Sequence, residues 1–122
     1  MTDSEKKRYF GLFFGVNDVV KEFGIPDGKR PADEEIVFAS YATPDCSGYA
    51  FVVFEINGIL YEVSGSHCSC YGLEGQWEPE ETFWEAMAAG NRLVDYEEHE
   101  EAARVRWNEL LREHVPFDMG AK

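Results

Sequence analysis

Four side chains in this sequence have the chemistry of metal ligands or of a reactive thiol site: His67, Cys68, Cys70 and the upstream Cys46. Thiolate sulfur and imidazole nitrogen are the ligands that zinc prefers in proteins. Structural zinc sites usually have ligands in two pairs, each separated by roughly two to four residues, whereas this chain has one Cys-x-Cys, an adjoining His and a distant Cys. The spacing therefore argues against a zinc site. It favours a structural role, in which these residues pack as small side chains inside a tightly folded loop.

Nucleophilic catalysis by Cys68 or Cys70 is a second hypothesis, and it requires a nearby histidine base. His67 directly precedes Cys68, and adjacent side chains of an extended chain point apart, so His99 or His114 would have to supply the base. The sequence contains no phosphate-binding glycine loop, no His-Glu-x-x-His pattern and no Gly-x-Ser-x-Gly elbow. These patterns favour a protein that is not an enzyme.

The elements that must position these residues centre on a β-hairpin. Two apolar runs, residues 49–56 and 59–64, flank Asn57-Gly58, which suits a two-residue type I′ turn. Such a turn predicts pairing of Ile56 with Ile59, Phe54 with Tyr61 and Val52 with Val63, all on a core face. The opposite face mixes apolar and acidic side chains, which predicts partial cover by a helix or a partner: Phe51, Val53, Glu55, Leu60 and Glu62.

A third strand is predicted over residues 35–41, and helices are predicted around it. Asn17 is the expected cap of a short helix ending at Gly24, and Thr82 with Glu85 has the spacing of a capping box for a helix over residues 82–89. A longer helix is expected from Asp95 to about residue 115, with an apolar stripe of Tyr96, Ala103, Trp107, Leu110 and Leu111. Residues 9–14 fit a helix or a strand. We therefore expect an α+β fold, a three-stranded antiparallel sheet with helices packed on one face.

Length and composition predict a single domain over residues 1–122. No apolar run is long enough to span a membrane, and the charged start lacks the pattern of a signal peptide. The odd number of cysteines, 3, argues against a disulfide framework. The sequence therefore predicts a cytoplasmic protein with reduced thiols.

Charge is the most unusual property of the chain. Its formal net charge is −13, and no Lys or Arg occurs between Arg30 and Arg92. Nucleic-acid binding needs clustered Lys and Arg, so direct binding of DNA, RNA or an anionic membrane through this region is disfavoured. A basic protein surface is favoured instead, although acidity can also serve solubility alone. The stretch contains Asp33, Glu34, Glu35, Asp45, Glu55, Glu62, Glu74, Glu78, Glu80, Glu81 and Glu85.

Residues 66–82, SHCSCYGLEGQWEPEET, together with the preceding hairpin, resemble a family of small uncharacterised proteins of bacteriophages and prophages. The resemblance spans residues 36–82. It implies a bacterial cytoplasm and an accessory role, and small acidic phage proteins often act by occupying a host or defence protein.

The combined hypothesis is an acidic accessory protein that binds and inhibits a bacterial nucleic-acid-handling or defence protein, with DNA mimicry as one form of this inhibition. The residues expected to bind the partner are Glu74, Trp77, Glu78, Glu97, Glu98, Glu100 and Glu101. The alternative hypothesis is a zinc-binding or thiol-dependent module built on Cys46, His67, Cys68 and Cys70. A third is a small-ligand binder that uses the mixed face of the hairpin.

Overall fold

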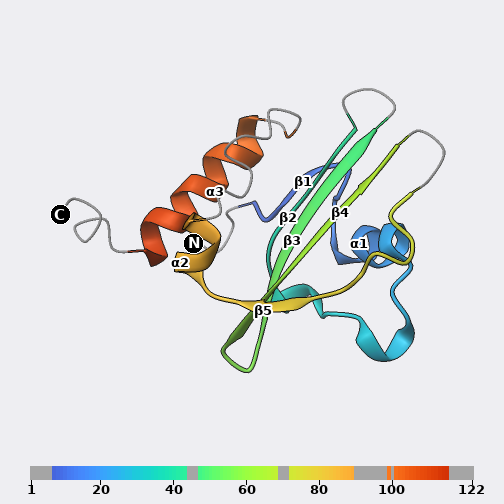
Figure 1. Cartoon of the computed structure of the whole chain (residues 1–122), viewed down its shortest axis with the longest axis horizontal. Helices are drawn as coiled ribbons and strands as arrows, with labels where there is room; N and C mark the ends of the chain where they lie inside the picture. The colour runs from blue at the N-terminus through green and yellow to red at the C-terminus, as the bar shows by residue number, and fades with distance from the viewer. Residues whose placement is uncertain (1–6, 44–46, 69–71, 90–98, 100, 116–122) are drawn as a thin grey trace.

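Five strands form one mixed sheet in the order β1-β2-β3-β4-β5 (Figure 1). The structure is a computed structural model, and it describes residues 7–43, 47–68, 72–89, 99 and 101–115. β1 runs parallel to β2, and the remaining pairs are antiparallel. The strands are β1 (Tyr9–Gly11), β2 (Ile36–Ala42), β3 (Gly48–Ile56), β4 (Ile59–His67) and β5 (Glu80–Thr82).

The α+β class is confirmed, and the prediction of three antiparallel strands is wrong. The three central strands lie near their predicted positions. The two edge strands, β1 and β5, are additional to the prediction. β1 and β5 have 3 residues each, which is too short for an alternating pattern to show in the sequence. Residues 9–14, left open between helix and strand, contain β1 and the turn after it.

Helices cover both faces of the sheet, so the prediction of helices on one face is also wrong (Figure 1). α1 (Val16–Phe23) packs on one face, and α2 (Trp84–Ala89) and α3 (Glu101–His114) pack on the other. The reason is that β2 and β3 are buried on both sides, with runs of consecutive apolar residues that no single layer of helices could cover. Two short 3₁₀ turns, η2 (Asp27–Lys29) and η3 (Asp33–Glu35), connect α1 to β2.

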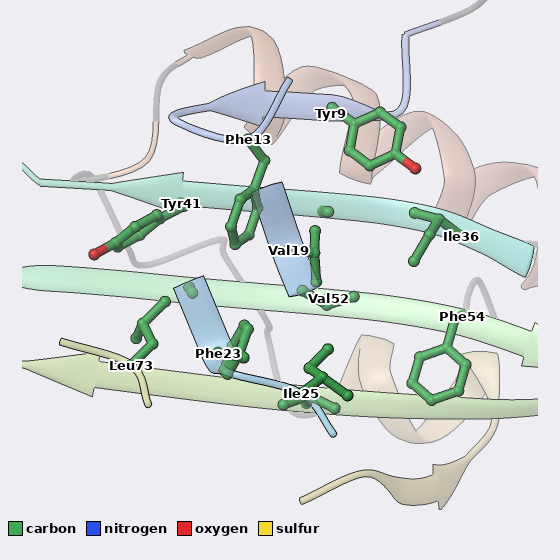
Figure 2. Close-up of a cluster of buried hydrophobic side chains, with 13 residues drawn as sticks. Tyr9, Phe13, Val19, Phe23, Ile25, Ile36, Tyr41, Val52, Phe54 and Leu73 are labelled. Atoms are coloured by element: carbon green, nitrogen blue, oxygen red, sulfur yellow. The ribbon is translucent and has the colours of Figure 1, made fainter. Parts of the chain in front are cut away.

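The β3–β4 hairpin has the predicted register. Val52 pairs with Val63, Phe54 with Tyr61 and Ile56 with Ile59. Asn57 and Gly58 have φ of 55° and 83°, as a type I′ turn requires. Val52 and Phe54 lie among the buried side chains under α1, shown in Figure 2, so this face packs into a core, as predicted.

The mixed face of the hairpin is covered by the C-terminal helix. Trp107 of α3 is fully buried and packs edge-on against Phe51, with ring centroids 5.2 Å apart. Val53 is buried in the same cluster, and Leu60 packs against it. Partial cover by a helix was one of the two predicted explanations for the apolar residues of this face, and it is confirmed.

Two predicted helix caps are wrong. Gly15, not Asn17, is the N-cap of α1, and the neighbouring Asp18 carboxylate accepts a hydrogen bond from the backbone N–H of Phe14 at 2.8 Å. Thr82 lies in β5 opposite Leu60, and α2 begins at Trp84, so Thr82 does not cap that helix. The predicted end of α1 is confirmed, since Gly24 adopts the left-handed conformation. The predicted start of the last helix at Asp95 lies outside the described residues.

The first strand is held in place by a close backbone approach to β2 at Gly11 and by side-chain contacts with Asp33. A Cβ on Gly11 would lie 2.1 Å from the Tyr41 carbonyl oxygen, so β1 can approach β2 only with glycine there. The Tyr9 hydroxyl donates a hydrogen bond to the Asp33 carboxylate at 2.6 Å, and the Arg8 guanidinium forms an ion pair with the same carboxylate. The hydrogen bond from Tyr9 and, after it, Arg8 lower the pKa of Asp33, and burial raises the pKa of Tyr9.

Among the described residues, no helix has the length and apolar character needed to cross a membrane.

Candidate functional site

His67 lies at the end of β4, and both of its ring nitrogens are hydrogen-bonded. Nδ1 is 2.8 Å from the Cys68 carbonyl oxygen, and Nε2 is 2.8 Å from the Tyr41 hydroxyl. A carbonyl oxygen can only accept, so Nδ1 carries the proton, and in the neutral ring Nε2 accepts from Tyr41. Gly48 leaves room for this arrangement, because a Cβ there would lie 2.1 Å from Nε2. The ring therefore presents no free lone pair to a metal or a substrate.

Tyr41 joins this histidine to the buried core. Its side chain is buried between strands and packs edge-on against the His67 ring at 6.0 Å. Burial raises the pKa of the Tyr41 hydroxyl, and the carboxylates of Glu22 and Glu74 raise it further. A tyrosine that keeps its proton is a hydrogen-bond donor to His67, and this pair anchors the end of β4 to β2.

Of the four candidate zinc ligands, the structure describes two, His67 and Cys68. Cys68 is exposed, and its neighbour His67 is engaged as described above. Cys46 and Cys70 lie outside the described residues. Within the part of the chain that the structure describes, no group of three His, Cys, Asp or Glu side chains could hold a metal ion. Zinc binding stays a prediction.

The two histidines considered as a base for a cysteine nucleophile have other partners. His99 is buried and its Nδ1 lies 2.7 Å from the Ser40 hydroxyl on β2. His114 stacks on Trp84 at 4.2 Å, and its Nδ1 donates to the Leu110 carbonyl. Both pairs lie on the face covered by α2 and α3, and no contact of either ring with Cys68 is observed among the described residues.

Leu73 and Trp77 pack on the α1 face of the sheet, and Figure 2 shows Leu73 in this cluster. Leu73 is fully buried beside Phe23, and a Cβ on Gly65 would lie 3.0 Å from both side chains. Trp77 is half-buried, stacks on Phe54 at 5.5 Å and meets Phe23 edge-on at 5.1 Å. The apolar residues of this segment therefore complete the core.

Gln76 lies at the outer edge of β4 beyond the residues that pair with β5, where the described residues provide no neighbouring strand. Its side-chain oxygen accepts from the Ser66 backbone N–H at 2.9 Å, and its nitrogen donates to the Ser66 carbonyl at 2.8 Å. The same nitrogen lies 3.2 Å from the Gly72 carbonyl. One amide side chain thus replaces the pairing that a neighbouring strand would give at Ser66.

Among the residues predicted to bind a partner, those that the structure describes lie on different faces of the sheet. Glu74 lies against Gly24 at the end of α1, whereas Glu101 begins α3 on the opposite face of the sheet. Trp77 packs with the α1-side core, and Glu78 is exposed just before β5. Glu97, Glu98 and Glu100 lie outside the described residues. Partner binding by these residues stays a prediction.

Three exposed acidic residues lie in β5 or just before it. Glu80 pairs with Glu62 and Glu81 pairs with Tyr61, so the two β5 carboxylates project to opposite faces of the sheet. Glu78, Glu80 and Glu81 are exposed, and none forms an ion pair within the described part of the chain. We call Glu78, Glu80, Glu81 and the following Phe83 the β5 edge.

The β5 edge also exposes an aromatic ring. Phe83 is 60% exposed, and Ile59, one position beyond the last β4–β5 pair, is 40% exposed. The sequence analysis includes Glu80 and Glu81 among the acidic residues without assigning them to a site, and it places Phe83 within the helix predicted over residues 82–89. The clue was Pro79 followed by two acids, a combination typical of the edge of a sheet.

Comparison with known proteins gives no match: no protein-family model, no curated protein and no solved structure is significantly similar to this chain.

Proposed function

We propose that this chain is a non-enzymatic interaction protein that binds a basic surface of another protein through its β5 edge. The observation that supports this most directly is that exposed carboxylates on both faces of an edge strand lie beside an exposed phenylalanine. Aromatic residues supply much of the energy of protein interfaces, and surrounding charges raise the encounter rate and select the partner.

The charge of the wider chain supports the same partner chemistry. No Lys or Arg occurs between Arg30 and Arg92, a stretch that includes β2 to β5 and α2. Charges closer than the Debye length, about 8 Å at physiological ionic strength, reinforce one another. Glu78, Glu80 and Glu81 are exposed and lie within four consecutive residues, so they concentrate negative charge at β5.

The proposed partner is a bacterial nucleic-acid-handling or defence protein. The bacterial setting depends on the resemblance of residues 66–82 to phage proteins, and the nucleic-acid-handling class depends on charge. A protein surface that holds phosphates carries clustered Lys and Arg, and carboxylates can occupy the same positions. Binding there would inhibit the partner by competition with DNA or RNA.

Affinity capture from a bacterial lysate with the intact chain as bait tests this proposal. We expect a protein that is retained at low salt and released by an about fourfold rise in ionic strength. The double variant Glu80→Gln/Glu81→Gln should lose it, and DNA should compete for it. If the amount of captured partner changes neither with salt nor with the double substitution, the proposal is contradicted.

The matched control is Glu34→Gln/Glu55→Gln, which removes the same charge from two exposed positions outside the β5 edge. We expect this variant to retain the partner. If it loses the partner while Glu80→Gln/Glu81→Gln retains it, the acidic surface is functional but lies elsewhere than at β5.

A further inference from the structure

The outer side of β5 is an open edge of the sheet in the part of the chain that the structure describes. β5 is last in the strand order, and its inner side pairs with Leu60, Tyr61 and Glu62 of β4. Within the described residues, no strand pairs with its outer side. An edge strand offers unpaired backbone N–H and C=O groups, which are the template for addition of another strand.

The residues of β5 determine which strand can be added. A second copy of this chain would bring Glu80 and Glu81 against the same residues, and like charges directly opposite one another are destabilising. Acidic side chains, a length of 3 residues and the preceding Pro79 are all features that prevent edge-to-edge aggregation. A basic strand reverses the sign of the interaction, so the same carboxylates that reject a second copy select a basic segment.

We propose that the basic partner binds by adding an extended segment to the outer side of β5, antiparallel to it. This inference depends on the proposed function and specifies its mode. Because Glu80 and Glu81 project to opposite faces, the segment needs two adjacent basic residues, one for each face. An apolar side chain two positions before the first of these basic residues would lie over Phe83, which is 60% exposed.

A short synthetic peptide of that pattern tests the mode of binding. In acetyl-Thr-Val-Thr-Lys-Arg-Thr-amide, antiparallel pairing places Val opposite Phe83, Lys opposite Glu81 and Arg opposite Glu80. Binding to the full isotopically labelled chain is followed by NMR. The expected result is a salt-sensitive shift of the backbone amides of β5, which a peptide with Glu in place of Lys and Arg does not produce.

Backbone methylation separates strand addition from charge attraction alone. Two versions of the peptide have the same side chains, with methyl groups on alternate backbone nitrogens: those facing β5 in one version and those facing solvent in the other. Loss of the backbone hydrogen bonds should weaken the first version by about tenfold or more relative to the second.

Each outcome bears on one of the two proposals. If both methylated peptides bind equally well, strand addition is wrong and the acidic interaction surface stands. If the unmethylated basic peptide does not bind, strand addition is also wrong, and lysate capture with the Glu80→Gln/Glu81→Gln bait decides the proposed function separately. A difference between the methylated peptides, together with shifts confined to β5 and its neighbours, supports strand addition.

Discussion

Residues 72–77 and residues 78–83 follow one another in the chain and use their side chains in opposite ways. The first segment turns its leucine, glutamine and tryptophan inward, where they fill the core and pair with the edge of β4. The second exposes three carboxylates and a phenylalanine. Trp77, which was predicted to bind a partner, thus packs against the core, and the segment after it offers the exposed groups that a partner could contact.

This difference has a physical origin in the sheet. β4 continues to His67, well past the residues that pair with β5, so its outer edge would be open at Ser66 without Gln76. An open edge of that length invites unwanted pairing. Residues 72–77 close it at Ser66, whereas in the described part of the chain no strand pairs with the outer side of β5. Along the β4–β5 side of the sheet, the place left for edge pairing is therefore the short acidic strand, where charge selects the partner.

The largest expected effect is on stability, from Leu73→Ala. Leu73 is fully buried against Phe23, so the substitution should lower the free energy of unfolding by about 2–5 kcal/mol. Urea denaturation measures the change. The control is Leu12→Ala, the same substitution at a residue that is 48% exposed, with an expected change of roughly 0.5 kcal/mol or less. Equal effects at the two positions would mean that segment 72–77 does not contribute to the core.

A smaller loss is expected from Gln76→Leu, which keeps the approximate volume and removes the amide. The Ser66 N–H and the carbonyls of Ser66 and Gly72 then lose their partner, which should cost about 1–3 kcal/mol because part of this site is buried. Hydrogen exchange at the Ser66 amide should become faster in the variant. If exchange there is unchanged, the glutamine does not close the β4 edge.

The sequence predicted the parts of this fold that depend on neighbouring residues. Asn57-Gly58 and the apolar runs beside it define the hairpin and its register locally, and the structure has both. The edge strands depend on pairing with distant residues: Tyr9 lies opposite Ala39, and Glu80 lies opposite Glu62. A segment of 3 residues has no periodicity of its own, so its pairing could not be predicted.

The candidate site shows the same limit. The sequence marks His67 as a candidate metal ligand, but the tyrosine that hydrogen-bonds its ring, Tyr41, is 26 residues away in the chain. Trp77 looked like a surface residue because its sequence neighbours are polar, yet it stacks on Phe54. Residue type identified the segment, whereas tertiary packing determined which of its side chains are available.

The smallest effect on stability, and a large one on binding, is expected from Phe83→Ala. Because the ring is 60% exposed, the free energy of unfolding should change by roughly 0.5 kcal/mol or less, while the captured partner should be lost or strongly weakened. The control is Phe14→Ala, an aromatic residue that is 82% exposed and follows β1 at the other edge of the sheet. Removing that ring should leave partner capture unchanged.

If both variants lose the partner, or only Phe14→Ala does, exposed aromatic surface matters but the β5 edge is not its location. If neither does, the carboxylates alone determine binding, and the contrast between the two adjacent segments is one of charge without an apolar anchor.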